Sequence, residues 1–271
     1  MSYTYTYTYT NTKKRKAFEM IDIANRTEKP REVGLTMVLD KGLGYRAAQD
    51  LMEYASEYID MIKLGWGTHR LCSEEVVKRK IQLYTDNSIL VSNGGTLFEI
   101  AYLQRKMDEF FEYAHQIGLN SVEISDGSIQ IGREERSEII RRCKNMGFEV
   151  FTEVGKKDPL EDAKLTIDYR IKQAKSDLDA GARKVIMEAR ESGKGIGVYD
   201  KEGKIKEDMV KKLIEGVGLR NIMFEAPEKS QQVYFILNLG HEVNLGNIKP
   251  EDAIPLETLR RGLRGDTLGR L

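Results

Sequence analysis

The chain repeats one pattern eight times: a short apolar run ends at a polar or glycine-containing turn, and a segment with helical periodicity follows. Continuous apolar runs separated by helices are typical of a parallel sheet that is covered on both faces. The apolar runs occupy residues 33–39, 58–64, 88–91, 119–124, 148–152, 184–187, 221–224 and 242–245. Eight strand–helix units in roughly 240 residues predict an α/β fold, a single (β/α)8 TIM barrel.

The segments between these runs carry helix end signals. Ser73 can cap one helix, and Gly147 stands where another should stop. The expected helices cover residues 46–58, 73–84, 107–117, 133–146, 166–180, 207–216, 229–239 and 256–264. An open doubly wound sheet is the alternative fold. Its glycine fingerprint is missing, because the glycines at 193–197 do not keep the GxGxxG spacing, and the chain has no P-loop.

Composition excludes several classes of protein. Lys+Arg and Asp+Glu both number 43, so the chain lacks the global basic field of a nucleic-acid-binding protein. Cys72 and Cys143 stand far apart, which argues against a disulfide framework or a zinc site and favours a reducing cytoplasm. No apolar run approaches the ~18 residues of a membrane span, and the N-terminus lacks an apolar signal region. We therefore expect a cytoplasmic protein without membrane or nucleic-acid partners.

The N-terminus differs from the rest of the chain. A Tyr-Thr alternation over residues 3–10 leads into a basic cluster at 13–16. Low-complexity termini of this kind are usually poorly ordered. We expect a disordered tail over residues 1–16 and a barrel domain over residues 17–271.

Acidic residues follow four successive strands, from the fourth to the seventh. In a barrel of this type all strands end at one mouth, so these carboxylates should meet there. Crowded carboxylates repel and raise one another's pKa, and a hard divalent cation such as Mg²⁺ relieves that repulsion. The candidate metal ligands are Glu123, Asp126, Glu153, Glu188 and Glu225. The alternative is that each carboxylate pairs with a Lys or Arg at the mouth.

Basic side chains and glycine turns should reach the same mouth, where they suit an anionic substrate. The candidate substrate-binding residues are Asp40, Lys41, Gly94, Gly95, Ser125, Arg190, Lys194, Gly246 and Asn247. Lys63 ends the second strand beside a flexible turn, so it is a candidate Schiff-base nucleophile or general acid. A plain salt bridge across the top of the barrel is the alternative for Lys63.

Several blocks of sequence closely resemble the phosphosulfolactate synthase family. The blocks are LDKG (39–42), KLGWGT (63–68), GGTLFE (94–99), VEISDG (122–127), TEVGKK (152–157), EARESGKG (188–195), FEAPEKSQQ (224–232) and LETLRRGLRGD (256–266). They occur in order from about residue 33 to the C-terminus. The resemblance implies the same barrel fold and a homo-oligomer.

This resemblance also implies a reaction, the Mg²⁺-dependent addition of sulfite to phosphoenolpyruvate. The product would be (2R)-3-phosphosulfolactate, which leads to coenzyme M in methanogens or to sulfolactate in some bacteria. Sulfite would attack the methylene carbon, and the resulting enediolate would be stabilised by the metal and protonated by a lysine. Glu153 and Glu188 would be metal ligands assisted by Glu123 or Asp126.

In the same mechanism the general acid would be Lys156 or Lys63. Arg190, Lys41 and the glycine turns would hold phosphate and sulfite. Two other functions fit the sequence: a Schiff-base lyase or aldolase that acts on a phosphorylated substrate through Lys63, and a non-catalytic, stress-associated barrel of the same family.

Overall fold

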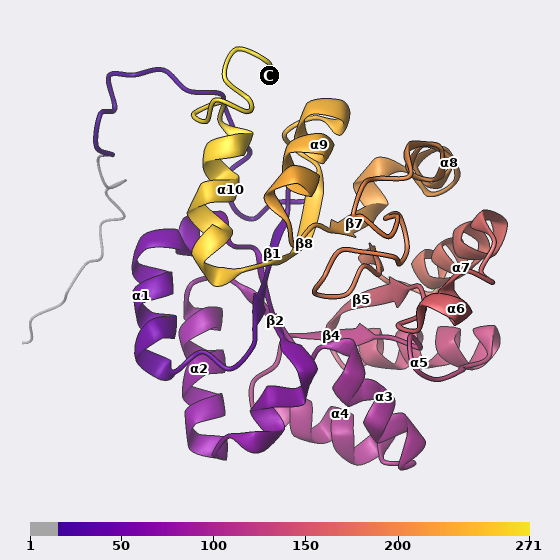
Figure 1. Ribbon diagram of the computed structural model, residues 1–271. Helices are drawn as coiled ribbons and strands as arrows, with labels where there is room; N and C mark the ends of the chain where they lie inside the picture. The colour runs from indigo at the N-terminus through magenta and orange to yellow at the C-terminus, as the bar shows by residue number, and fades with distance from the viewer. Residues whose placement is uncertain (1–15) are drawn as a thin grey trace, which may run out of the picture.

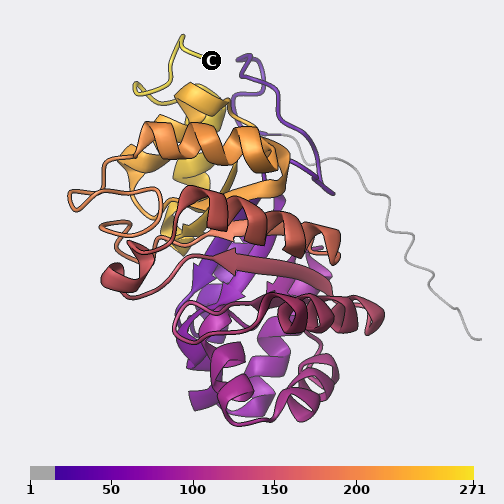
Figure 2. The same cartoon turned by 90° about the vertical axis from the view of Figure 1, so that its right-hand side faces the viewer.

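The computed structural model describes residues 16–271, so the tail expected over 1–16 lies outside the described residues except for Lys16. Eight parallel strands form a nearly closed barrel that is surrounded by helices (Figures 1 and 2). The strands are β1 (Thr36–Asp40), β2 (Met61–Leu64), β3 (Leu90–Ser92), β4 (Ser121–Ile124), β5 (Glu149–Val154), β6 (Lys184–Met187), β7 (Ile222–Glu225) and β8 (Asn244–Ile248). The hydrogen-bonded order is β3-β2-β1-β8-β7-β6-β5-β4. The predicted barrel is thus confirmed.

Helices fill the connections between consecutive strands. They are α1 (Tyr45–Ala55), α2 (Glu74–Asp86), α3 (Gly95–Leu103), α4 (Met107–Gln116), α5 (Arg133–Asn145), α6 (Pro159–Asp162), α7 (Ile167–Asp179), α8 (Glu207–Val217), α9 (Lys229–Leu239) and α10 (Ala253–Arg260). Ser73 stands at the start of α2 as predicted, but its side chain makes no capping hydrogen bond. Gly147 ends α5 in the left-handed region, with φ +90°. Within residues 16–271 no helix has both the length and the apolar character that a bilayer crossing requires.

The strands are apolar because both of their faces are covered. One large hydrophobic cluster lies between the strands and the helices. A smaller cluster fills the inside of the barrel, with Met37, Phe151 and Met223 among its buried members. These two layers explain why the strand sequences are continuous apolar runs.

The eighth strand is longer than the sequence predicts. It was expected to end at residue 245, but β8 continues to Ile248. Gly246 therefore lies inside the strand, where an added Cβ would come within 2.5 Å of the Cε of Met37. Asn244 opens the strand, and its Oδ1 accepts a hydrogen bond from Leu35 N (3.1 Å) at the opposite end of the barrel. The sequence indicates a turn at Gly246, but in the structure this glycine allows close packing inside the strand.

Buried ion pairs close the barrel end at which the strands begin. Arg31 Nη1 lies 2.9 Å from Asp60 Oδ1, and Arg26 Nε lies 3.3 Å from Glu257 Oε2. Arg260 is fully buried and donates from Nη1 to Val243 O at 2.8 Å. Burial, reinforced by Arg26, lowers the pKa of Arg260 to about 9. These pairs stabilise the fold, because the chemistry of such barrels takes place at the opposite end.

Candidate active site

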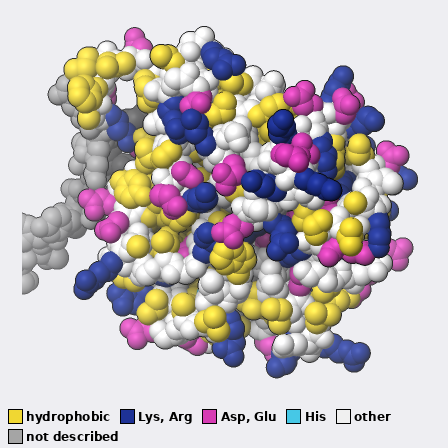
Figure 3. All heavy atoms as spheres, in the orientation of Figure 1, with side chains coloured by type: hydrophobic (Ala, Val, Ile, Leu, Met, Phe, Trp, Pro, Cys, Tyr) yellow, Lys and Arg dark blue, Asp and Glu magenta, His cyan; other side chains and the backbone are white. Residues whose placement is uncertain are grey.

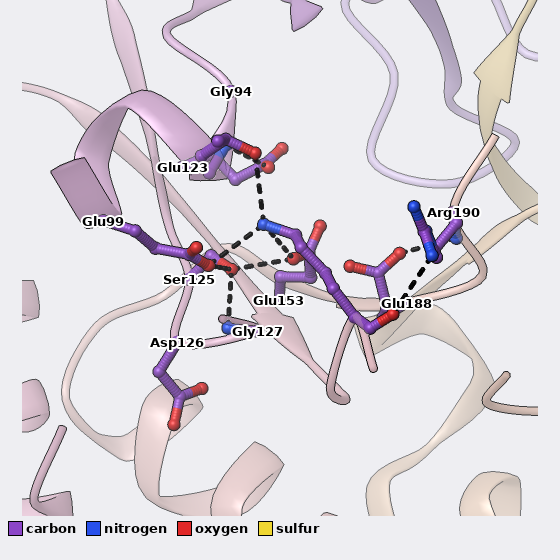
Figure 4. Close-up of polar contacts among 12 residues, drawn as sticks. Gly94, Glu99, Glu123, Ser125, Asp126, Gly127, Glu153, Glu188 and Arg190 are labelled. Atoms are coloured by element: carbon purple, nitrogen blue, oxygen red, sulfur yellow. Dashed lines mark hydrogen bonds and ion pairs between the residues drawn. The ribbon is translucent and has the colours of Figure 1, made fainter. Parts of the chain in front are cut away.

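A cavity of about 220 Å³ lies where the strands end. Its lining includes Lys63, Trp66, Lys157 and Arg190, together with four of the predicted carboxylates, Glu123, Glu153, Glu188 and Glu225. These side chains come from the ends of β2 and β4 to β7 and from the loops that follow them. The convergence of strand-end carboxylates that the sequence predicts is therefore present in the structure, and Figure 4 shows the central members.

Lys63 occupies the centre of the carboxylates. Its Nζ lies 2.9 Å from Glu225 Oε1, 3.1 Å from Glu123 Oε2 and 3.6 Å from Glu153 Oε2. Burial acts to lower the pKa of Lys63, but the three carboxylates outweigh it and raise the pKa well above its ordinary value. Lys63 is therefore protonated at neutral pH. The salt bridge that was the alternative for this residue is present.

Three carboxylates from adjacent strands approach one another closely. One oxygen from each of Glu153, Glu188 and Glu225 lies within 4.8 Å of the others. The Oε1 of Glu188 accepts a hydrogen bond from Arg190 N at 2.5 Å, whereas its buried Oε2 accepts none from any residue in the range 16–271. An orphaned carboxylate oxygen beside two other carboxylates requires a proton or a cation.

The carboxylates differ in their affinity for protons. Burial raises the pKa of Glu188 well above its ordinary value, and Glu153 and Glu225 raise it further. Burial also raises the pKa of Glu123 to about 7, although Lys63 opposes the change. Burial acts in the same direction on Glu153, but the ammonium groups of Lys157 and Lys63 outweigh it and lower the pKa to about 2. Without a cation, Glu188 and Glu123 therefore take up protons more readily than Glu153, which stays ionised at neutral pH.

Lys157 and Glu99 belong to this cluster, and the sequence did not single them out. Lys157 Nζ lies 3.0 Å from Glu99 Oε1 and 3.7 Å from Glu153 Oε1. Burial acts to lower the pKa of Lys157, but Glu153 and Glu99 hold it above its ordinary range. One signal pointed to Glu99: it is the one charged residue in the otherwise apolar segment of α3, and it is buried there.

Ser125 links the two acidic partners of Lys157. Its Oγ lies 2.6 Å from Glu99 Oε1 and 2.7 Å from Glu153 Oε1. A hydroxyl has a single hydrogen, so it can donate to only one of these carboxylates at a time. The positive charge of Lys157 stabilises the remaining contact. Ser125 therefore supports the acidic wall of the cavity.

Lys156 and Asp126 do not join the carboxylate cluster. Lys156 Nζ lies 3.1 Å from Asp126 Oδ2 and donates to Ile129 O at 2.7 Å. Asp126 Oδ1 accepts a hydrogen bond from Arg136 Nη1 at 2.9 Å. Figure 4 shows the Asp126 carboxylate turned away from Glu123 and Glu153. The cause is Arg136, a buried residue of α5 that captures Asp126.

Asp40 is fully engaged by the chain itself. Its Oδ1 accepts hydrogen bonds from the backbone N–H groups of Gly42 (2.9 Å) and Leu43 (2.7 Å). Its Oδ2 accepts the Tyr84 hydroxyl at 2.8 Å and lies 2.6 Å from Lys80 Nζ. The structure gives Asp40 the role of fixing the turn after β1 to α2 rather than a place in the cavity lining.

Lys41 lies on the rim of the cavity. Its Nζ is 2.5 Å from Glu191 Oε1 and 5.1 Å from the centroid of the Trp66 ring. Glu191 and Trp66 both line the cavity. Lys194 lies on the same β6–α8 loop as Glu191, but it is exposed and outside the lining.

The paired glycines hold the start of α3 close to Glu123. Gly94 has φ +69° and lines the cavity. The N–H of Gly95 donates to Glu123 Oε1 at 2.7 Å, and an added Cβ on Gly95 would lie 2.5 Å from Ser125 Cβ. Glycine is needed here because nothing larger fits between the helix and the strand end.

Backbone strain gathers at the rim. Trp66, Arg190 and Asn247 adopt φ of +55°, +58° and +53°, although none of them is glycine. All three line the cavity. Asn247 is buried, and its Nδ2 donates weakly to Arg190 O at 3.5 Å. Its Oδ1 accepts no hydrogen bond from the described residues. Strain of this kind costs about 1–3 kcal/mol per residue and is retained mainly at functional sites.

The surface around this fold is electrically mixed. Basic and acidic side chains are interspersed over the face shown in Figure 3, without one continuous basic area. That pattern agrees with equal numbers of basic and acidic residues in the chain.

Comparison with known proteins agrees with the geometry. A model of the family described as (2R)-phospho-3-sulfolactate synthase (ComA) matches residues 24–266. A phosphosulfolactate synthase from Methanocaldococcus jannaschii is 55% identical over 238 residues, covering 88% of this chain and 95% of the relative. Another from Methanothermobacter thermautotrophicus is 51% identical over 246 residues, covering 91% of this chain and 95% of that protein.

Solved structures show the same architecture at low sequence identity. The 3-hexulose-6-phosphate synthase of Salmonella typhimurium is similar with a TM-score of 0.53 and 14% identity, over 87% of this chain and 94% of that one. At this identity the similarity supports the barrel fold alone. The family match and the two relatives go further, and they show that this chain belongs to the (2R)-phospho-3-sulfolactate synthase family.

Proposed function

We propose that this protein joins sulfite to phosphoenolpyruvate to form (2R)-3-phosphosulfolactate. The observation that carries the proposal is the single cavity in which strand-end carboxylates meet Lys63, Lys157 and Arg190. Relatives named phosphosulfolactate synthase, at 51% and 55% identity, support the same reaction class, a lyase-type enzyme.

The donor set of the cavity fits Mg²⁺. Glu153, Glu188 and Glu225 offer one oxygen each within 4.8 Å, and carboxylate oxygens are the ligands that Mg²⁺ prefers. Within the part of the chain that the structure describes, no group donates a hydrogen bond to the buried Oε2 of Glu188. Bound there, Mg²⁺ would supply Lewis-acid stabilisation of the negative charge that develops on the substrate carboxylate.

The balance of charges in the cavity also supports a bound divalent cation. Two ammonium groups, Lys63 and Lys157, lie among the carboxyl groups of Glu99, Glu123, Glu153, Glu188 and Glu225. If all five carboxyl groups were ionised, they would outnumber the two ammonium groups and repel an anionic substrate. Glu153, Glu188 and Glu225 would hold a divalent cation that offsets this negative charge, and the basic rim would then attract phosphate and sulfite.

The rim supplies the groups that would hold the anions. The guanidinium of Arg190 can bind phosphate with two parallel hydrogen bonds. Asn247 adds a buried amide with an unused Oδ1, and Lys41 adds a rim ammonium beside Trp66. We assign phosphate and sulfite to this side of the cavity and the substrate carboxylate to the acidic side.

The chemistry then needs one proton. The sulfur of sulfite forms a bond to the methylene carbon, and the electron pair of the carbon–carbon double bond moves onto the middle carbon and its carboxylate. A proton delivered to one face of the middle carbon completes the product and sets the R configuration. Lys157 is the proposed donor, because it lines the cavity whereas Lys156 is bound to Asp126 outside it. Lys63 holds the carboxylates in place.

The Schiff-base alternative has less support. An amine must lose its proton before it can attack a carbonyl. The carboxylates around Lys63 keep it protonated. A non-catalytic barrel is also disfavoured, since burying this many ionisable groups costs free energy that a scaffold would not need to spend.

The reaction can be tested directly. The protein is incubated with phosphoenolpyruvate, sulfite and Mg²⁺, and the products are followed by ³¹P and ¹³C NMR. We expect a new phosphosulfonate whose formation stops when a chelator removes the metal. A folded protein that yields no product under these conditions would contradict the proposal.

A further inference from the structure

Among the strands of residues 16–271, one pair of neighbours in the barrel, β3 and β4, meets at a seam that has no ladder of backbone hydrogen bonds. Seven pairs of neighbouring strands exchange backbone hydrogen bonds, and the hydrogen-bonded order begins at β3 and ends at β4. Buried backbone N–H and C=O groups at such edges must find other partners. In this protein two asparagine side chains provide them.

The two asparagine side chains cross the seam in opposite directions, one from the β4 side to β3 and the other from the β3 side to β4. Asn120, just before β4, accepts from Val91 N at 2.7 Å and donates to Ile89 O at 3.2 Å. Asn93, just after β3, accepts from Glu123 N at 3.0 Å and donates to Glu123 O at 3.3 Å. Each side-chain amide thus accepts and donates as a peptide group of a neighbouring strand would.

The two bridges lie at different ends of the strands. Asn120 contacts Ile89, just before β3, and Val91 within it, and neither of these residues lines the cavity. Asn93 contacts Glu123, which lines the cavity, and it also donates to Gly94 O at 2.8 Å. The next residue, Gly95, donates from its N–H to Glu123 Oε1. A stretch of three residues therefore holds both the main chain and the side chain of Glu123.

The hydrogen bonds from Asn93 and Gly95 to Glu123 determine where the second carboxylate oxygen of Glu123 lies. With Oε1 bound to Gly95 N, Oε2 is left 3.1 Å from Lys63 Nζ. We infer that Asn93 is a positioning residue: its amide closes the seam between β3 and β4 and thereby fixes Glu123 against Gly95 and Lys63. Asn93 is 1% exposed, so water does not compete for these bonds.

Asn120 offers a matched control. It closes the same seam with the same chemistry, but its side chain bonds to Val91 and Ile89, which do not line the cavity. Asn93→Ala and Asn120→Ala each remove one bridge without adding charge. The catalytic consequence rests on the proposed function, whereas the seam itself can be measured without any activity.

The experiment combines two readouts on the full-length protein. Steady-state kinetics of sulfite addition give kcat and KM, and NMR gives the hydrogen-exchange rate of the Glu123 backbone amide. For Asn93→Ala we expect kcat to fall on the order of 10- to 100-fold, as small misplacements at active sites do, with KM changed far less. For Asn120→Ala we expect kcat within about threefold of wild type, as for a change away from the reacting groups. The Glu123 amide should exchange faster in Asn93→Ala than in Asn120→Ala.

The possible results distinguish the positioning role of Asn93 from the proposed function of the protein. Equal kcat losses in the two variants, or an unchanged exchange rate at Glu123 in Asn93→Ala, would overturn the positioning role. If the wild-type protein makes no product, the proposed function fails. The exchange rate of the Glu123 amide then tests on its own whether Asn93 closes the seam between β3 and β4. If Asn93→Ala does not fold, the isosteric Asn93→Asp, which keeps the acceptor but loses the donor, is compared with Asn120→Asp.

Discussion

Lys63 at the end of β2 reaches Glu225 at the end of β7, and the two charged atoms lie 2.9 Å apart. The two strands are not neighbours in the sheet. The pair therefore bridges the barrel, and it is almost fully buried, with 7% and 1% of the side chains exposed. Removing one partner of a buried pair leaves an unpaired charge in the interior, which is costly.

Lys63→Met should destabilise the protein strongly. The carboxylates of Glu123, Glu153 and Glu225 lose their common cation, and we expect the free energy of unfolding at neutral pH to fall by about 3–5 kcal/mol. Urea denaturation of the metal-free protein measures the change. Lys41→Met, which breaks a partly exposed pair on the rim, is the control and should cost no more than about 1 kcal/mol. Similar losses in the two variants would contradict the bridging role of Lys63.

Stability of the metal-free protein should fall as the pH rises towards neutrality. The pKa of Glu123 is raised from 4.5 to about 7, and the pKa values of Glu188 and Glu225 are raised too. A carboxyl group with a raised pKa in the folded state stabilises the fold below its unfolded pKa, and that stability is lost as the pH rises through the folded pKa. We therefore expect the free energy of unfolding to decline between pH 4.5 and about 7 and beyond.

Glu153 behaves in the opposite way, because its pKa is lowered to about 2, so its contribution is present above pH 4.5 and is lost only in strong acid. Urea midpoints measured across the pH range, with and without Mg²⁺, test both parts. A decline that Glu123→Gln leaves unchanged would show that Glu123 does not take part in it.

Lys157 and Lys156 should differ sharply in a pair of charge-preserving variants. Arginine keeps the positive charge but gives up a proton far less readily than lysine. Lys157→Arg should lower kcat by about 10²–10⁴-fold, the usual contribution of a positioned acid, while phosphoenolpyruvate still binds. Lys156→Arg keeps the contact with Asp126 outside the cavity and should stay within about tenfold of wild type. The reverse ranking would make Lys156 the proton donor.

The strand-end carboxylates could be predicted from sequence because the barrel itself brings them together. Once the repeat of strand and helix is recognised, Glu123, Glu153, Glu188 and Glu225 must converge. The side chains that follow a strand by two or more residues could not be placed in this way. Gly155, with φ +143°, redirects the chain after β5, so Lys157 enters the cavity while Lys156 turns towards Asp126.

Other residues depended on tertiary contacts that local sequence does not reveal. Arg136 draws Asp126 away from the mouth, and the strand β8 runs past Gly246. Glu99 is carried by a helix, so no rule about strand ends could find it. In the sequence, Asn93 reads as an ordinary turn residue and Asn120 as part of the strand predicted over residues 119–124, because their shared role exists only once β3 and β4 lie side by side.

Titration of the metal-free protein with Mg²⁺ in a calorimeter tests the carboxylate site most directly. We expect one Mg²⁺ per chain in the wild type and in the rim control Glu191→Gln. Glu188→Gln, which removes the orphaned carboxylate, should weaken the affinity on the order of 100-fold or more. If Glu188→Gln binds Mg²⁺ as tightly as the wild type, or the wild type binds none, then Glu153, Glu188 and Glu225 do not form a metal site.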